Sequence, residues 1–177
     1  DGDRHNSDFW EYNTETNTWR EIQSYPGEKI ERGLGFVVNG KGFVCTGRNN
    51  GLYNLDFWEF DPEGLSWTKR SPDSNDSDYD EFVRAVQRHD AVALTVNEKA
   101  YIVGGISSAG TSDKGVYEFN SSSYVWNTRT SFEGSARSAA VAYVLDGRAF
   151  VGTGQNGSNM YDDVWEFKPS EAYDEDN

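Results

Sequence analysis

The sequence predicts an all-β fold built from repeated four-stranded antiparallel sheets, because three kinds of marker recur along its 177 residues with one period. Aromatic residues of the third strand of each unit are spaced by 48, 59 and 48 residues, at Trp10, Trp58, Tyr117 and Trp165. Tryptophans of the fourth strand stand at Trp19, Trp67 and Trp126, and glycines that end the second strand stand at Gly47, Gly105 and Gly154. A period near 50 residues with four strands per unit is typical of the blades of a β-propeller.

The segment 32–70 shows one complete unit most clearly. Apolar or alternating runs of strand length lie at 33–38, 41–47, 55–61 and 66–70. Asn39-Gly40 is a strong signal for a two-residue hairpin turn, because that turn needs a positive φ at both positions. Asp61-Pro62 ends the third run with another turn signal. One such sheet has two faces to bury, so it needs neighbours of the same kind.

The repeats divide the chain into one partial propeller domain over 1–177. We expect a half blade at 1–25, a blade at 32–70, an acidic insertion at 71–87 and a blade at 88–130. A last blade without its outer strand follows at 137–169, and an acidic tail at 170–177. The insertion explains the longer spacing of 59 residues, and 81–87 should form one or two helical turns capped by Asp78 or Asp80.

Complete propellers have ~4–8 blades, so the chain is expected to cover about half of one. It opens within a blade, as a cut or processed chain would. Its last blade ends after a third strand, as in closed propellers whose N-terminal segment supplies the missing strand. We therefore expect the other half to come from elsewhere.

The repeated motifs resemble those of kelch proteins. A Gly-Gly or Thr-Gly after an apolar strand is followed by an acidic-aromatic cluster and then by a tryptophan. The phrases DFWEYNTETNTW, NGKGFVCTG and NGSNMYDDVWEF are most similar to kelch proteins of bacterial cell surfaces, whose propellers are related to the central domain of galactose oxidase. The resemblance implies a kelch-type β-propeller and an extracytoplasmic location, at the cell surface or in the periplasm. It leaves function open, because one fold hosts many functions.

The net charge of −14 excludes some classes of partner. A nucleic-acid surface needs a basic face that displaces counterions, and anionic lipids attract basic segments. No apolar run approaches the ~18 residues of a membrane span. We expect a protein or glycan partner, and no nucleic acid or transmembrane segment.

Arginines that precede the innermost strands could form a binding site. Arg32, Arg88 and Arg137 stand in the loops that, in kelch propellers, enter the innermost strand at the central face. Three guanidinium groups around one axis would suit a carboxylate, a phosphate or an acidic peptide. The alternative is that each arginine pairs with a carboxylate of its own or the adjacent blade, such as Glu59, Glu118 or Glu166.

The acidic insertion contains a weak calcium motif. Asp76, Asp78 and Asp80 have the 1-3-5 spacing of oxygen ligands around a calcium ion. Glu81 stands where the EF-hand loop has its turning glycine, and Gln87 replaces the closing glutamate. A solvated charge run and a partner-contact loop are the alternatives. We expect no other cofactor.

The residues available for catalysis are few. Cys45 is the single cysteine and lies in a strand, at a position that Val103 and Gly152 occupy in the other units, so it reads as a packed small residue. Of the two histidines, His5 and His89, only His89 enters a central-face loop, where it either touches a ligand or lies on the surface. The copper site of galactose oxidases needs two histidines, two tyrosines and a Tyr–Cys crosslink, and nothing here matches it.

Two functions from different classes stay open. The favoured one is a non-enzymatic module that binds a protein or glycan, or acts as a scaffold, in a surface or envelope assembly. The alternative is a carbohydrate-active propeller that resembles the kelch-type sialic-acid mutarotases. Arg32, Arg88, Arg137 and His89 would then form half of a pocket in which arginine holds the sugar carboxylate.

Overall fold

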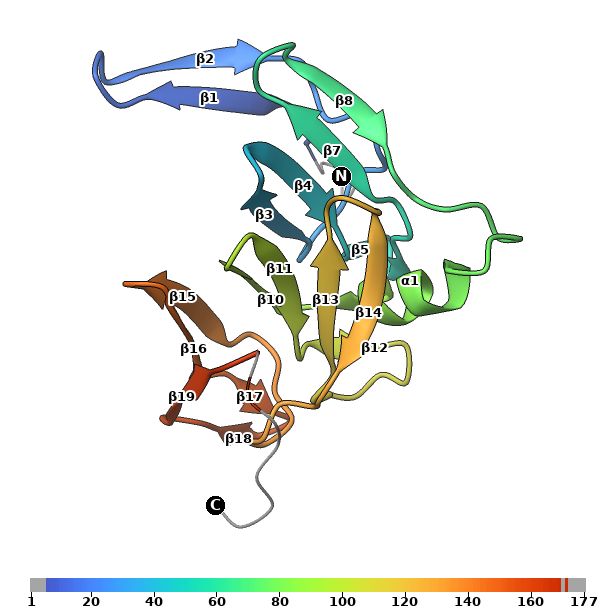
Figure 1. Cartoon of the computed structure of the whole chain (residues 1–177), viewed down its shortest axis with the longest axis vertical. Helices are drawn as coiled ribbons and strands as arrows, with labels where there is room; N and C mark the ends of the chain where they lie inside the picture. Colours follow the sequence, from blue (N-terminus) through green and yellow to red (C-terminus); the bar gives the residue numbers. More distant parts are fainter. Residues whose placement is uncertain (1–5, 170, 172–177) are drawn as a thin grey trace.

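The computed structural model describes residues 6–169 and 171, and these residues form antiparallel sheets that follow one another along an arc (Figure 1). The acidic tail at 170–177 therefore lies outside the described residues, apart from Glu171. The predicted all-β propeller architecture is confirmed, because each complete sheet is four-stranded and antiparallel with the order of a meander.

Four sheets make up the arc, and we call them the half blade and the first, second and third blades. The half blade contains β1 (Phe9–Asn13) and β2 (Thr18–Ile22). The first blade contains β3 (Leu34–Val38), β4 (Lys41–Cys45), β7 (Trp58–Asp61) and β8 (Ser66–Lys69). The second contains β10 (Val92–Val96), β11 (Lys99–Val103), β13 (Val116–Asn120) and β14 (Val125–Arg129). The third contains β15 (Val141–Leu145), β16 (Arg148–Gly152) and β19 (Val164–Phe167).

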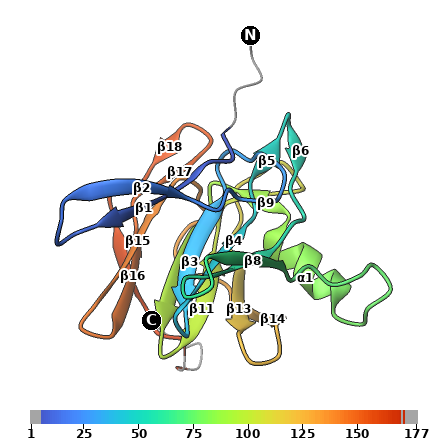
Figure 2. The same cartoon turned by 90° about the horizontal axis from the view of Figure 1, so that it is seen from above.

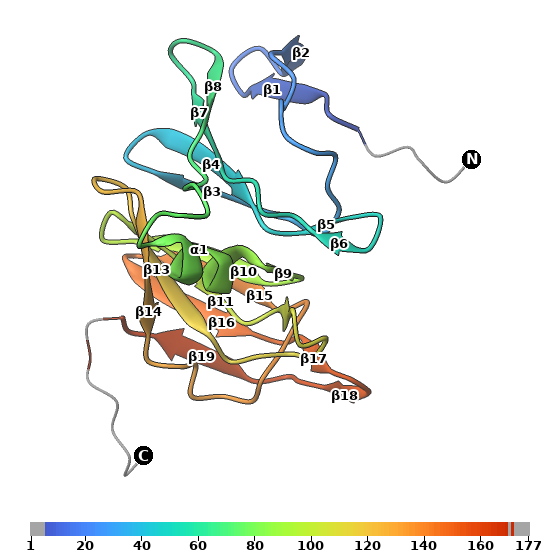
Figure 3. The same cartoon turned by 90° about the vertical axis from the view of Figure 1, so that its right-hand side faces the viewer.

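Short strand pairs extend each blade on one side of the molecule. They are β5 (Arg48–Asn49) with β6 (Leu52–Tyr53), β9 (Arg88–His89) with β12 (Ile106–Ser107), and β17 (Gln155–Asn156) with β18 (Asn159–Met160). Figure 3 shows β5, β6, β9, β17 and β18 on the same side. We call this side the loop face.

The predicted hairpin turn at Asn39-Gly40 is present, with φ angles of 51° and 72°. Val38 pairs with Lys41, so the loop between β3 and β4 has two residues. Asp146-Gly147 makes the same turn in the third blade. Turns with positive φ at both positions match the twist of the strands they join, which explains why these short polar dipeptides fix the register of each blade.

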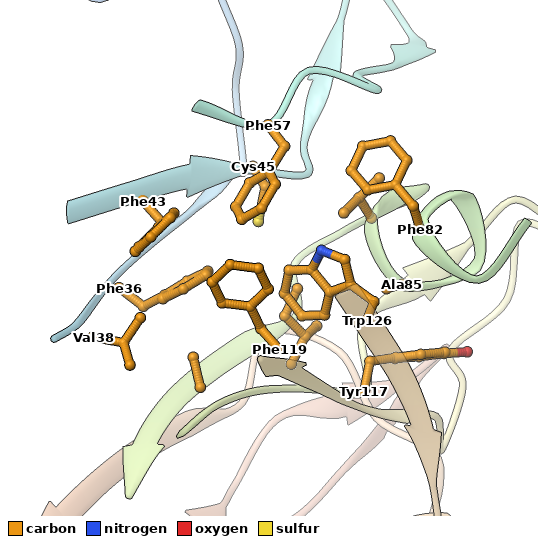
Figure 4. Close-up of a cluster of buried hydrophobic side chains, with 13 residues drawn as sticks. Phe36, Val38, Phe43, Cys45, Phe57, Phe82, Ala85, Tyr117, Phe119 and Trp126 are labelled. Atoms are coloured by element: carbon orange, nitrogen blue, oxygen red, sulfur yellow. The ribbon is translucent and has the colours of Figure 1, made fainter. Parts of the chain in front are cut away.

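The main core lies between the first and second blades and is rich in aromatic rings (Figure 4). Phe57 and Phe119 are fully buried and meet edge to face with their centroids 5.0 Å apart. Trp126 packs against both of them. Such aromatic contacts add to the free energy of area burial, so they help to hold the first and second blades together. A second cluster fills the space between the second and third blades, around Val103 and Val151.

One helix occupies the acidic insertion. The sequence predicted a helical segment at 81–87, and the structure has α1 at Tyr79–Val86. Asp78 stands at its N-cap position, but its side chain makes no capping hydrogen bond, so the predicted cap is not formed. Phe82, Ala85 and Val86 are buried, which is the i, i+3, i+4 pattern of a helix that covers an apolar surface. Figure 2 shows α1 on the side of the molecule away from β15 and β16. Within the described residues, no helix is long and apolar enough to cross a membrane.

Candidate functional site

The loops that enter the innermost strands carry an equivalent residue in each blade. Arg32, Asp90 and Ala139 each lie two positions before the first residue of β3, β10 and β15. All three have left-handed backbone, with φ angles of 56°, 54° and 51°. The amide of Asp90 donates to the carbonyl of Arg32 at 3.3 Å, and the amide of Ala139 donates to the carbonyl of Asp90 at 2.8 Å. Backbone hydrogen bonds thus connect successive blades at these positions, and we call this row the axial ladder.

Arg32, His89 and Asp90 form a hydrogen-bonded group at the ladder. The Oδ2 atom of Asp90 lies 3.2 Å from Nη1 of Arg32 and 2.9 Å from Nδ1 of His89. Tyr53, from β6, stacks on the imidazole of His89 with a centroid distance of 5.8 Å, and its hydroxyl donates to the carbonyl of Ser107 at 2.6 Å. We call Arg32, Tyr53, His89 and Asp90 the central-face cluster.

Exposure divides the cluster into an outer and an inner part. The side chain of Arg32 is 49% exposed and that of Asp90 is 23% exposed, whereas that of His89 is 4% exposed. The buried imidazole of His89 therefore fixes the position of the Asp90 carboxylate by a hydrogen bond. Arg32 and Asp90 present a donor and an acceptor side by side. Such a pair can bind a ligand that carries hydroxyl, amide or carboxylate groups.

Arg88, predicted to face the axis, is buried inside the second blade with 1% of its surface exposed. Its guanidinium group donates to the carbonyls of Ala85, Gly104 and Arg84 at 2.6 to 2.9 Å and lies 3.2 Å from Asp113. The carbonyls of Arg84 and Ala85 belong to the last turn of α1, and Gly104 directly follows β11. The side chain fixes the insertion helix to the blade, which is a structural role.

Arg137 has the same kind of environment in the third blade. It is 1% exposed, donates to the carbonyls of Ser135 and Thr153, and makes two hydrogen bonds with Asp163 at 2.6 and 2.8 Å. This bidentate contact holds the pKa of Asp163 at about 2, well below its usual value. The ring of Tyr161 covers the guanidinium group at 4.7 Å.

The structure therefore does not gather three equivalent guanidinium groups. Arg88 and Arg137 lie four residues before β10 and β15, whereas Arg32 lies two residues before β3, so Ile30 is the equivalent of the two buried arginines. The alternative, that each arginine pairs with a carboxylate of its own or the adjacent blade, is confirmed, because Arg32 pairs with Asp90, Arg88 with Asp113 and Arg137 with Asp163. The carboxylates suggested as examples are different, because Glu59, Glu118 and Glu166 pair with Arg70, Arg129 and Arg148 of their own blades. That Arg32 and His89 take part in ligand binding stays a prediction.

The acidic insertion does not bring its aspartates together. Among residues 6–169 and 171, no group of three or more His, Cys, Asp or Glu side chains is placed to hold a metal ion. Asp76 accepts a hydrogen bond from the amide of Asp73 at 2.9 Å, and Asp78 stands at the N-cap of α1. The 1-3-5 spacing of Asp76, Asp78 and Asp80 is therefore used by a turn and a helix start.

Cys45 is fully buried, as its strand position predicted. Burial raises the pKa of its thiol, which disfavours the reactive thiolate.

Two members of the central-face cluster, Tyr53 and Asp90, were missed by the sequence analysis. Asp90 could have been found by aligning the units on the first residue of each innermost strand instead of on arginine. Tyr53 gave no such signal, because it comes from a hairpin outside the four-strand repeat.

Comparison with known proteins agrees with this geometry. A family model described as the kelch motif matches residues 87–132, which contain the second blade. No curated protein sequence matches the chain. The solved structure of YjhT superposes with a TM-score of 0.70 and 14% sequence identity, over 95% of this chain and 61% of the YjhT chain. The chain thus spans about three fifths of the length of that structure. Its repeats, its blades and this superposition together give it the fold of a kelch-repeat β-propeller.

Proposed function

We propose that the chain belongs to a binding or scaffolding propeller that holds a polar partner at the central-face cluster. The observation that carries the proposal is the pair of the exposed Arg32 and the half-buried Asp90, whose carboxylate is also hydrogen-bonded to the buried His89. The pair stands on the axial ladder, so its position follows from the backbone of two blades. Binding residues on loops of a rigid scaffold are the usual arrangement in such folds.

The proposed partner is a protein or a glycan. Both offer hydroxyl, amide and carboxylate groups that can meet one guanidinium group and one carboxylate. The similarity of the third-strand motifs to kelch proteins of bacterial surfaces supports a place in a surface or envelope assembly, outside the cytoplasm. The remaining blades of the propeller would come from further chain or from another subunit.

A second candidate function is catalysis on an anionic sugar, as in the sialic-acid mutarotases. The observation that favours it is the hydrogen bond between the imidazole of His89 and Asp90, a pair able to move a proton, beside a guanidinium group able to hold a carboxylate. The burial of His89 favours the binding function, because a general base must reach the proton that it removes.

Substitutions of Arg32 and Asp90 test both functions. Asp90→Asn and Arg32→Gln should lower capture on a glycan array, or capture of an isolated protein partner, by about tenfold or more, since a charged hydrogen bond contributes ~1.5–3 kcal/mol. Arg20→Gln is the matched control, because Arg20 is an exposed arginine of the half blade that pairs with Glu11. Unchanged capture by both variants would contradict the proposal. Anomerisation of sialic acid can be followed by NMR. Catalysis would be favoured if the unmodified protein and Arg20→Gln accelerate the anomerisation and Asp90→Asn and Arg32→Gln do not.

A further inference from the structure

The third blade has an open strand edge. β19 pairs with β16 on one side, and among the described residues no strand pairs with its other side. Its equivalents β7 and β13 each pair there with an outer strand, β8 or β14. The register fixes the equivalence, because Phe60, Phe119 and Phe167 each lie opposite the second residue of the second strand. The propeller fold therefore implies a fourth strand beside β19, and the paired outer strands show which side chains it needs.

Each paired outer strand carries a tryptophan against an aromatic ring of the third strand. Trp67 lies opposite Phe60, and Trp126 lies opposite Phe119, with ring centroids 4.9 and 5.0 Å apart. The half blade repeats this contact with two rings at 4.8 Å. Phe167 holds the same position in the third blade, and no residue that the structure describes lies opposite it on the open side. A tryptophan there would restore a contact that contributes beyond its area burial.

Each outer strand also supplies an arginine to the glutamate of the third strand. Arg70 donates to Glu59 at 2.9 Å, and Arg129 donates to Glu118 at 2.9 and 3.0 Å. In both blades the arginine stands three residues after the tryptophan. An arginine of β2 pairs with the equivalent glutamate of the half blade as well. The two complete blades therefore share the outer-strand pattern Trp-x-x-Arg.

Glu166 holds the position of these glutamates without an outer-strand arginine. Arg148 of β16 donates to both of its oxygens at 2.8 Å, as Lys99 of β11 donates to Glu118 at 2.9 Å. One oxygen of Glu118 accepts from Lys99 and Arg129 together, so such a carboxylate can hold two cations. The side chain of Glu166 is 28% exposed, whereas that of Glu118 is 5% exposed. Glu166 thus has an open side that a second cation can reach.

We infer that the edge of β19 binds an extended segment with the pattern Trp-x-x-Arg. Its tryptophan lies opposite Phe167, and its arginine donates to Glu166. In this register the arginine stands opposite Val164, as Arg129 stands opposite Val116 in the second blade. Main-chain hydrogen bonds along the edge provide the general affinity of strand addition, and the two side chains provide the specificity.

The segment belongs to the polypeptide that supplies the remaining blades. Residues 168–177 contain neither a tryptophan nor an arginine. The two printed segments with the pattern, 67–70 and 126–129, are already paired within the first and second blades. The chain spans 61% of the YjhT structure, so the fold has further strands to provide. The inference does not depend on the proposed function, because β19 shares no residue with the central-face cluster.

The test uses a fluorescein-labelled peptide with the sequence of residues 122–131, SSYVWNTRTS, as the probe. The 177-residue protein is titrated into it at concentrations at which light scattering shows a monomer, and fluorescence polarisation measures binding. We expect saturable binding that weakens by about tenfold or more when the peptide carries Trp126→Ala or Arg129→Gln. Hydrogen exchange of the protein should slow at the amides of 164–167 when the peptide is bound.

A double-mutant cycle identifies the partner of the peptide arginine. Glu166→Gln in the protein should weaken the parent peptide by about tenfold and should remove the difference between it and the Arg129→Gln peptide. Glu171→Gln is the control, because it removes the same charge from an exposed glutamate near the end of β19 that pairs with Lys168. Absence of binding, equal binding of all three peptides, or equal losses in Glu166→Gln and Glu171→Gln would overturn the inference. Binding without slower exchange at 164–167 would also overturn it, since the peptide would then occupy another edge.

Discussion

Glu118 shows how a single charge is held inside the second blade. It is 4% exposed and accepts hydrogen bonds from Arg129, Lys99 and Tyr101 at 2.9 to 3.1 Å. Burial alone would raise the pKa of Glu118, but these three donors outweigh it and lower the pKa to about 2. The ionised form is therefore the one that stabilises the fold.

The pH dependence of stability follows from that pKa. The folded-state pKa lies below the unfolded value, so the contribution is complete above about pH 5 and is lost as the pH falls towards 2. Glu118→Gln should lower the free energy of unfolding at pH 7 by roughly 1–3 kcal/mol and should flatten its decline between pH 5 and 2. Urea denaturation at a series of pH values measures both effects.

Glu11 provides the matched control for Glu118. It stands at the same strand position in the half blade and pairs with Arg20, but its side chain is 42% exposed. Exposed ion pairs contribute ~0–1 kcal/mol, so Glu11→Gln should change little. Equal acid profiles for the two variants would show that the donors around Glu118 do not depress its pKa.

Gly105 is a second residue whose environment permits few changes. Its φ angle is +87°, and an added Cβ would lie 2.7 Å from Cβ of Ala91 and 2.8 Å from the carbonyl oxygen of His89. Gly105→Ala should cost ~1–2 kcal/mol for the left-handed backbone and roughly 1–3 kcal/mol more for the steric conflict. Gly110→Ala is the control, because Gly110 has a φ angle of +76° with nothing within 4 Å. If chemical denaturation gives both variants the same loss of unfolding free energy, the left-handed backbone alone accounts for the cost at Gly105.

At the scale of the element, the tryptophans of the fourth strands occupy the same repeat position in three different surroundings. Trp19 is 64% exposed, Trp67 is half-buried against Phe9 and Tyr25 of the half-blade segment, and Trp126 is buried between the first and second blades. Trp126→Ala should cost ~3–5 kcal/mol, Trp67→Ala less and Trp19→Ala below ~1 kcal/mol. Denaturation midpoints should follow that order, and a Trp19 effect as large as that of Trp126 would mean that blade packing does not set the cost.

Some elements of the structure could be predicted from the sequence and others could not. The strands came from alternation and turn signals, which are local: Asn39-Gly40 between two apolar runs predicts a hairpin without knowledge of distant residues. The left-handed residues of the axial ladder are different. Arg32, Asp90 and Ala139 share a backbone conformation but no side-chain chemistry, so a comparison of residue types aligned Arg32 with the wrong partners.

Long-range contacts account for the rest of the candidate site. The stacking of Tyr53 on His89 joins a hairpin of the first blade to the loop that enters the second. Sequence reasoning therefore found the blades and the insertion but not which of their residues meet.

At the scale of the whole molecule, the two outermost sheets expose apolar side chains. On β15, Val141, Tyr143 and Leu145 alternate along one face and are 47% to 60% exposed. In the half blade, Trp10, Tyr12 and Trp19 are 42% to 64% exposed. Exposed faces of this kind, with open strand edges, favour association with other chains.

We therefore expect the 177-residue chain, expressed alone, to self-associate as its concentration rises. Val141→Thr, Tyr143→Thr and Leu145→Thr together should reduce the mean mass measured by light scattering, because threonine retains the preference for strands but not the apolar surface. Leu52→Thr with Met160→Thr is the control, since these residues are 75% and 77% exposed on short hairpins of the loop face. If only the control pair lowers the mass, the face of β15 is not the contact surface.

The axial ladder has a consequence for how such a molecule can change. Its hydrogen bonds use main-chain atoms alone, so the ladder restricts its side chains only through the left-handed backbone at each position. Ala139 leaves its place beside Asp90 without a functional group, and asparagine or aspartate would tolerate the same left-handed backbone. A substitution that suits this backbone should therefore change the groups offered to a ligand and leave the hydrogen bonds between the blades unchanged.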